Sequence, residues 1–126
     1  MKKKIMVVDD EPDVIFAVEF NLKKFDEGYE VIRADSGKKC LEFLENNEIP
    51  DLILLDIMMP EMSGWETYNK IKENPSWEKI PIVFLTARVD RTAEHAGSFL
   101  GEDYIEKPYD PADLKKRIEK VLRENS

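Results

Sequence analysis

Three unbroken apolar runs are the feature of this chain that most restricts its fold. They occupy residues 5–8, 52–55 and 82–85, and a polar or acidic residue follows each of them. Continuous rather than alternating apolar patterning predicts strands that are covered on both faces, as in a parallel sheet with helices on either side. Weaker runs at residues 29–34 and 103–106 predict two further strands nearer the edges of the sheet.

Helix start signals lie between these strands. Pro12 suits the first turn of a helix, Ser36 and Asp90 are N-cap residues, and Asp110 followed by Pro111 opens the last helix. Five strands that alternate with five helices predict a three-layer α/β sandwich over residues 1–126. Right-handed crossovers then place the carboxyl end of every strand at one edge of the sheet.

Length and composition restrict the classes of protein to which the chain can belong. A chain of 126 residues, with 42% hydrophobic and 37% charged residues, has the size and balance of one globular domain. Its net charge of −8 argues against direct binding to a nucleic-acid backbone. The single cysteine, Cys40, excludes an intramolecular disulfide, and we expect it to be buried. The first apolar run is too short for a signal peptide or a membrane span, so we expect a cytoplasmic protein without membrane contact.

Polar residues with matching chemistry follow the predicted strands. Asp9 and Asp10 follow the first, Asp56 the third, Thr86 the fourth and Lys107 the fifth. Ligands of open parallel sheets bind beyond the carboxyl ends of the strands, so these side chains are expected in one crevice. Three converging carboxylates repel one another, and they either hold a raised proton or bind a hard cation such as Mg²⁺.

The same residues suit phosphoryl transfer. A carboxylate can attack phosphorus to form an acyl phosphate, and this transfer needs mainly positioning and charge stabilisation. Lys107 offers a positive charge for one phosphoryl oxygen and Thr86 a hydroxyl donor for another. Taken singly, each residue is also what a helix cap or a solvated loop shows. Their coincidence at four strand ends favours a site.

Motifs spread over residues 5–121 carry a family resemblance. They are Val7-Val8-Asp9-Asp10-Glu11-Pro12, Asp51-Leu52-Ile53-Leu54-Leu55-Asp56-Ile57-Met58-Met59-Pro60, Ser63-Gly64, Ile82-Val83-Phe84-Leu85-Thr86-Ala87 and Asp103-Tyr104-Ile105-Glu106-Lys107-Pro108-Tyr109. In these motifs the chain resembles the receiver domain of bacterial and archaeal response regulators, of the chemotaxis-receiver type. The resemblance implies a flavodoxin-like (βα)5 sandwich whose five-stranded parallel sheet has the strand order 2-1-3-4-5.

The resemblance also implies roles for individual residues at the acidic site. Asp56 would be the phosphorylation site. The Mg²⁺ ligands would be Asp10, Asp56 and the backbone carbonyl of Met58, with Asp9 acting through a metal-bound water. Lys107 would reach the phosphoryl group because the Lys107-Pro108 peptide is expected to be cis in this family.

Switching and partners follow from the same resemblance. Thr86 would move toward the phosphoryl group and Tyr104 would rotate inward, which alters the surface of residues 90–123. The phosphoryl donor would be a sensor histidine kinase or a phosphotransfer protein, and the receiver of the signal a downstream protein or output domain. Phosphorylation could also promote a homodimer. Such a domain is not an enzyme, although it promotes its own phosphotransfer and slow autodephosphorylation.

Features of the sequence argue against three other classes of protein. A phosphatase of the haloacid-dehalogenase kind needs a second Asp two residues after its nucleophile, and Met58 stands there. A receiver-like module that signals by protein contacts alone would be marked by loss of Asp9, Asp56 or Lys107, and all three are present. A nucleotide- or flavin-binding protein would carry a glycine-rich loop after the first strand, which this sequence lacks.

The first predicted helix has apolar residues on two sides. Val14, Ile15, Val18 and Leu22 form one arc of the helical wheel, whereas Phe16 and Phe20 lie outside it. Our hypothesis is that the two phenylalanines form a docking surface for a histidine kinase or a second copy of the chain. The alternative is that neighbouring loops cover them.

Overall fold

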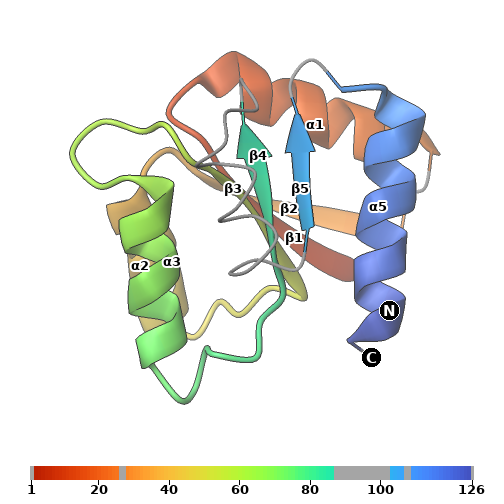
Figure 1. Ribbon diagram of the computed structural model, residues 1–126. Helices are drawn as coiled ribbons and strands as arrows, with labels where there is room; N and C mark the ends of the chain where they lie inside the picture. Colours follow the sequence, from red (N-terminus) through yellow and green to blue (C-terminus); the bar gives the residue numbers. More distant parts are fainter. Residues whose placement is uncertain (1, 26–27, 87–102, 107–108, 126) are drawn as a thin grey trace.

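The fold is a parallel sheet with helices on both faces (Figure 1). The structure, a computed structural model, describes residues 2–25, 28–86, 103–106 and 109–125. The strands are β1 Lys3–Val8, β2 Tyr29–Ala34, β3 Leu52–Asp56, β4 Ile82–Thr86 and β5 Asp103–Glu106. Their order is β2-β1-β3-β4-β5, and every neighbouring pair is parallel. The predicted strand order is confirmed, with the two weaker strands at the edges.

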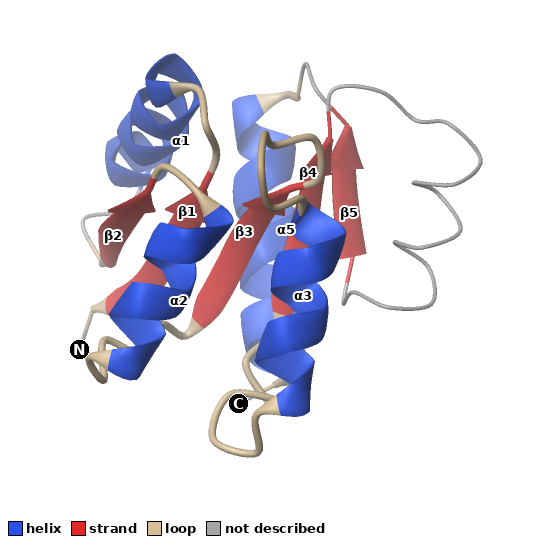
Figure 2. Cartoon of the chain, turned by 90° about the vertical axis from the view of Figure 1, so that its left-hand side faces the viewer, coloured by secondary structure: helices blue, strands red, loops and turns tan. Residues whose placement is uncertain are grey.

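Four helices are described. They are α1 Pro12–Phe25, α2 Gly37–Glu45, α3 Gly64–Glu73 and α5 Pro111–Glu124. Helices α2 and α3 cover one face of the sheet and α1 and α5 the other (Figures 1 and 2). The helix expected from Asp90 lies outside the described residues. None of the described helices is both long and apolar enough to cross a membrane.

The strand boundaries differ slightly from the apolar runs. β1 begins at Lys3, because its pairing with β2 extends over two exposed lysines, with Lys3 opposite Tyr29. β3 and β4 each run one residue past the apolar run, so Asp56 and Thr86 belong to the sheet itself. The ladder places Asp56 opposite Leu85 on the neighbouring strand. The backbone of Asp56 is therefore held by a central strand and not by a loop.

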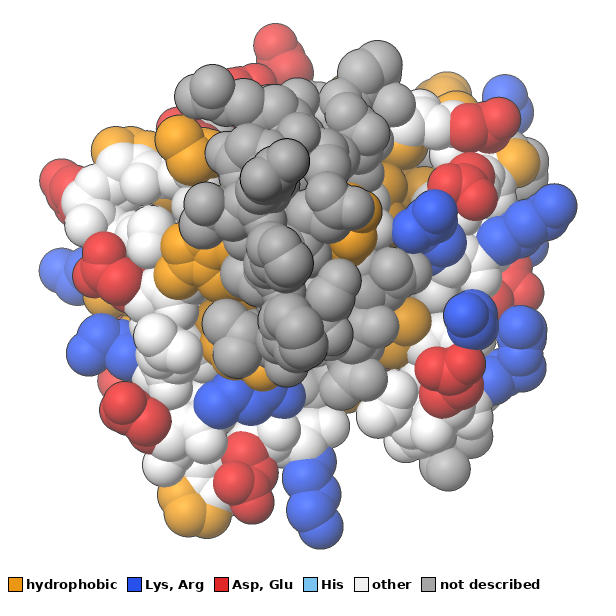
Figure 3. Space-filling view, viewed as in Figure 1, with side chains coloured by type: hydrophobic (Ala, Val, Ile, Leu, Met, Phe, Trp, Pro, Cys, Tyr) orange, Lys and Arg blue, Asp and Glu red, His pale blue; other side chains and the backbone are white. Residues whose placement is uncertain are grey.

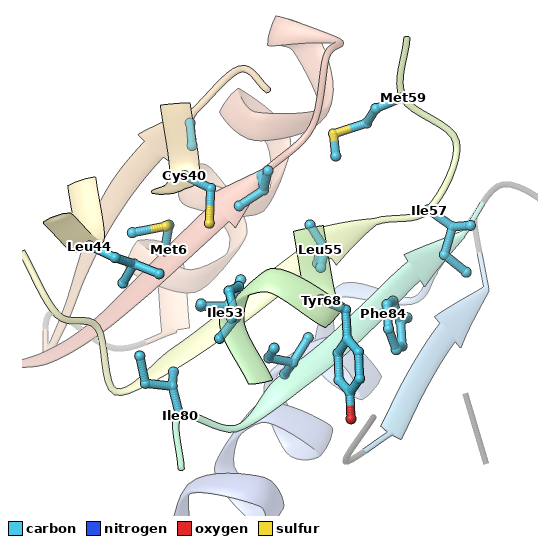
Figure 4. Close-up of a cluster of buried hydrophobic side chains, with 14 residues drawn as sticks. Met6, Cys40, Leu44, Ile53, Leu55, Ile57, Met59, Tyr68, Ile80 and Phe84 are labelled. Atoms are coloured by element: carbon cyan, nitrogen blue, oxygen red, sulfur yellow. The ribbon is translucent and has the colours of Figure 1, made fainter. Parts of the chain in front are cut away.

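Two apolar cores, one on each face of the sheet, account for the unbroken runs. Met6 and Val8 of β1 face the core under α2 and α3 (Figure 4), whereas Ile5 and Val7 face the core under α1 and α5. Each fully buried large aliphatic or aromatic side chain contributes about 1.5–3 kcal/mol relative to its exposed state. Cys40 lies in the first core, where burial raises the pKa of its thiol to about 12. Its expected burial is confirmed.

The predicted start signals open the helices as expected. Pro12 is the first residue of α1. The Ser36 hydroxyl accepts a hydrogen bond from the Lys39 amide at 3.0 Å, and Asp110 Oδ1 accepts one from the Ala112 amide at 2.8 Å. Caps of this kind contribute about 1 kcal/mol each. They fix the residue at which each of these helices begins.

An ionic cluster joins α1 to the edge strand β2. Glu19 is 8% exposed, and its carboxylate accepts hydrogen bonds from Arg33 Nε at 2.7 Å and from Lys23 Nζ at 2.9 Å. Burial alone would raise the pKa of Glu19, but the hydrogen bonds and the positive charges of Lys23 and Arg33 outweigh it, and the pKa is lowered. The ionised carboxylate therefore stabilises the folded chain.

Replacing Glu19 by Gln should lower the free energy of unfolding at pH 7 by about 1–2 kcal/mol, because Arg33 and Lys23 lose a charged acceptor. A carboxylate with a lowered folded-state pKa stabilises the fold above its unfolded pKa, and this contribution disappears as the pH falls through the folded value. The gap between wild type and Glu19→Gln should thus close in acid. Urea unfolding at pH 7 and at lower pH values measures it.

Glu42→Gln is the matched control for this experiment, since Glu42 is exposed and contacts Lys39 at 3.8 Å only. Its stability difference from wild type should be small at each pH. A gap for Glu19→Gln that stayed constant into acid would contradict the role of the ionised carboxylate.

Candidate functional site

Three carboxylates meet at the carboxyl edge of the sheet. Asp9 and Asp10 follow β1, Asp56 ends β3, and each offers an oxygen within 4.8 Å of the others. β1 and β3 are neighbours, with Val8 opposite Leu55, so the residues that follow these positions come side by side. The structure thus brings together the three acidic residues that the sequence analysis placed in one crevice.

The three carboxylates differ in burial. Asp9 is fully buried and Asp56 is 4% exposed, whereas Asp10 is exposed. Oδ1 of Asp9 accepts a hydrogen bond from the Glu11 amide at 2.9 Å, which fixes this carboxylate in the turn that leads into α1. The cluster therefore has a rigid buried side and a side that faces solvent.

The donor atoms of this cluster fit a hard divalent cation. Like charges so close together repel one another strongly where water is largely excluded. All the ligand atoms are carboxylate oxygens, which suit Mg²⁺ better than the softer metals that histidine and cysteine bind. The exposed side at Asp10 leaves room for the waters that Mg²⁺ normally retains. The residues present therefore fit Mg²⁺.

A tightly folded loop follows Asp56. The Met59 amide donates to the Ile57 carbonyl at 3.2 Å, and the Met62 amide donates to the Pro60 carbonyl at 2.8 Å. Glu61, which lies between Pro60 and Met62, has a φ of 65°, which non-glycine residues rarely adopt. Backbone conformations of this kind cost about 1–3 kcal/mol and gather at functional sites. Met58, whose carbonyl was expected to bind the metal, lies in this loop with its side chain 60% exposed.

Gly64 packs directly against the backbone of Asp56. Its amide donates to the Ile57 carbonyl at 2.9 Å. A Cβ at this position would collide with the carbonyl oxygen of Asp56 and lie 2.8 Å from the Cα of Ile57. No role was predicted for Gly64 from the sequence. The available signal was the Ser63-Gly64 pair, in which Ser63 caps α3 by accepting from the Glu66 amide at 3.2 Å.

The remaining predicted site residues are described only in part. Thr86 ends β4 opposite Glu106, and its side chain lies outside what the structure describes. Lys107 and Pro108 are also outside it, and so is the peptide expected to be cis. Tyr104 lies in β5, and its side chain packs against the core under α2 and α3. The roles of these residues stay predictions.

The two phenylalanines of α1 are open to solvent. Phe16 is 68% exposed and Phe20 58%, and their rings stack with centroids 6.3 Å apart. No described loop covers them, although the opposite side of α1 is buried as expected. They line a groove of about 470 Å³ together with Glu19, Lys23, Lys24 and Arg33.

Comparison with known proteins adds a family match. The model of a family described as the response regulator receiver domain matches residues 5–119. A probable cyclic di-GMP phosphodiesterase of Vibrio cholerae is 44% identical over 120 residues, which are 94% of this chain and 26% of the relative. The alkaline phosphatase synthesis transcriptional regulatory protein PhoP of Bacillus subtilis is 37% identical over 98% of this chain and 50% of its own length. The chain thus spans half or less of these relatives.

A solved structure agrees with the fold. The crystal structure of a putative response regulator from Chloroflexus aurantiacus superposes with a TM-score of 0.89 at 31% identity. The match covers 98% of this chain and 99% of that one.

Gly64→Ala should lower the free energy of unfolding by about 1–3 kcal/mol, because the added methyl group forces the backbone of Asp56 and Ile57 to shift. It should also weaken Mg²⁺ binding, since the displaced backbone carries Asp56. Urea unfolding and calorimetric Mg²⁺ titration measure the two effects.

Gly37→Ala provides a control of the same size. Its methyl group would meet side-chain atoms of Thr67 and Met62 and not the backbone of Asp56. It should reduce stability without weakening Mg²⁺ binding. Equal Mg²⁺ affinities for wild type and Gly64→Ala would show that the glycine has no role at the acidic cluster.

Proposed function

The chain belongs to the response regulator receiver family, and on this premise we propose that Asp56 accepts a phosphoryl group from a phosphohistidine donor. The observation that carries the proposal is the meeting of Asp9, Asp10 and Asp56 at the carboxyl edge of the sheet, within 4.8 Å of one another. Asp56 alone of the three belongs to a strand, and its backbone is held by β4 and by Gly64. It is therefore the best positioned nucleophile.

The metal of this reaction would be Mg²⁺, held by Asp10, Asp56 and the carbonyl of Met58, with Asp9 acting through a water molecule. The all-oxygen donor set of the acidic cluster supports this assignment. When bound, Mg²⁺ supplies neutralising charge and open coordination positions for phosphoryl oxygens.

In the transfer step a carboxylate oxygen of Asp56 attacks phosphorus. The new O–P bond forms as the P–N bond to the donor imidazole breaks, and the electron pair of that bond stays on the imidazole nitrogen. The attacking group is the carboxylate form of Asp56, which has no proton to lose in this step. Positioning and charge stabilisation therefore suffice. By family resemblance, Lys107 and Thr86 would each contact a phosphoryl oxygen.

Phosphorylation would act on a two-state equilibrium. The phosphoryl group favours whichever state contacts it better, and Thr86 and Lys107 would provide those contacts. Tyr104 would turn inward, and the surface formed by residues 90–123 would change. The output would pass to a downstream protein or an attached output domain, in the cytoplasm, with a phosphorylation-dependent homodimer as one form of output. As a signalling domain the chain would catalyse only its own phosphotransfer and slow autodephosphorylation.

The exposed side of α1 would dock the phosphoryl donor. The helix begins at Pro12, directly beyond Asp10 and Glu11, so it lies next to the acidic cluster. Phe16 and Phe20 are exposed and stacked, which makes an apolar contact surface without further rearrangement. A histidine kinase or phosphotransfer protein that packs there would hold its phosphohistidine close to Asp56.

Incubation with acetyl phosphate and Mg²⁺ tests the proposed nucleophile. Wild type should gain one phosphoryl adduct by intact mass, and Asp56→Asn should gain none, because the amide is a poor nucleophile. Chelation of Mg²⁺ should prevent the adduct. A wild-type chain that stayed unmodified while binding Mg²⁺ would favour a protein-interaction module that works without phosphorylation.

Replacing both Phe16 and Phe20 by Ser tests the docking surface. Transfer from a phosphorylated kinase domain that labels wild type should slow by about tenfold or more, since an apolar hot spot is lost. Labelling by acetyl phosphate, which needs no docking, should be unchanged. Ile49→Ser, at a 36% exposed apolar residue away from α1, is the control. An unaltered rate of transfer to the double variant would show that this side of α1 is not part of the docking surface.

A further inference from the structure

A hydrogen bond joins α5 to the edge strand β5. Nη1 of Arg117 donates to the main-chain carbonyl of Tyr104 at 3.0 Å, while Nε of the same guanidinium donates to Asp113 Oδ2 at 3.1 Å. Asp113 lies one turn earlier on α5. Because the guanidinium is planar and rigid, the contact with Asp113 also sets the direction in which Nη1 points. Arg117 therefore holds the Tyr104 carbonyl in a fixed geometry relative to α5.

The position of Tyr104 makes this contact unusual. Tyr104 packs its side chain against the core under α2 and α3, whereas the next residue, Ile105, packs into the core under α5. The side chain of Tyr104 thus lies on the opposite face of the sheet from α5. β5 is an edge strand, so it has a neighbouring strand on one side only. Arg117 reaches this edge and contacts the main chain of Tyr104 directly.

A hydrogen bond and an apolar contact between β5 and α5 respond differently to a displacement. Ile105 packs with Leu114 and Ile118 in an apolar cluster, and such packing has no strong directional preference. A hydrogen bond weakens steeply when its angle or length changes. A small movement of the Tyr104 main chain would therefore weaken the hydrogen bond with Arg117 before it disturbed the packing of Ile105 in the apolar core.

We propose that Arg117 is a positioning residue that couples Tyr104 to α5. The inference rests on the proposed function, in which Tyr104 turns inward when Asp56 is phosphorylated. That turn displaces the Tyr104 carbonyl, changes its bond with Arg117, and lets the guanidinium and Asp113 reorient on the surface of α5. Basic and acidic side chains are interspersed over α5 on the right of Figure 3, so a reoriented ion pair alters the charge pattern that a partner meets.

The test compares wild type with Arg117→Met and Arg117→Lys, all as full chains. Hydrogen exchange of peptides from residues 111–124, measured with Mg²⁺ before and after acetyl phosphate, reports on α5. Fluorotyrosine incorporation reports on Tyr104, whose signal among the four tyrosines is assigned with Tyr104→Phe. Lys116→Met, an exposed position on the same helix, is the control for loss of one positive charge.

Wild type and Lys116→Met should show a phosphorylation-dependent change in the exchange of α5. In Arg117→Met this change should be at least about threefold smaller, while the phosphoryl adduct and the response of the Tyr104 signal persist. Arg117→Lys keeps the charge but lacks the rigid planar fork that fixes both hydrogen bonds in one geometry, so it should lose most of the change as well. A residue with only a structural role would alter exchange equally in both states and leave the difference intact.

Two results would overturn the inference, and they are distinguishable. An adduct on Arg117→Met together with a full wild-type response of α5 would overturn the coupling role alone. No adduct on wild type would overturn the proposed function and the coupling with it.

Discussion

Burial of the central strands on both faces is the constraint on which the rest of the structure depends. β1, β3 and β4 have apolar side chains on each face, so helices must cover both. Parallel pairing then follows, and it brings the strand ends to one edge. A slip of one residue would exchange the two cores and carry Asp56 out of line with Asp9. The register that fills the cores is thus the register that assembles the acidic cluster.

The acidic cluster lowers the free energy of unfolding, whereas the two apolar cores raise it. Two buried carboxylates beside a third repel one another, and Glu61 in the adjoining loop has an unfavourable backbone conformation. The burial of the strands beneath on both faces offsets this local cost. Gly64 then holds the backbone of Asp56 at close range. Natural proteins commonly contain such locally unfavourable features at functional sites.

The spacing of the apolar residues and the residue types at strand ends and helix starts made much of this architecture predictable. The strands, their edge or central positions, the caps at Ser36 and Asp110 and the acidic cluster all follow from local patterns. Contacts that depend on distances in the folded chain were not predictable. The fit of Gly64 against Asp56 requires the position of a carbonyl, and the Glu19–Arg33 pair requires the packing of α1 on β2. Helical periodicity separated Phe16 from the buried side of α1, but only the fold shows that nothing described covers it.

The same division into two faces determines how a change at the acidic edge can reach α5. Side chains of successive residues on β5 point into different cores, so a rearrangement around Tyr104 would take place on the side of α2 and α3. A close-packed sheet transmits little of it by side-chain contact through its own thickness. The main chain is common to both faces, and an edge strand exposes it. Through the bond from Arg117 to the Tyr104 carbonyl, α5 would therefore respond to that main chain without any side chain having to cross the sheet.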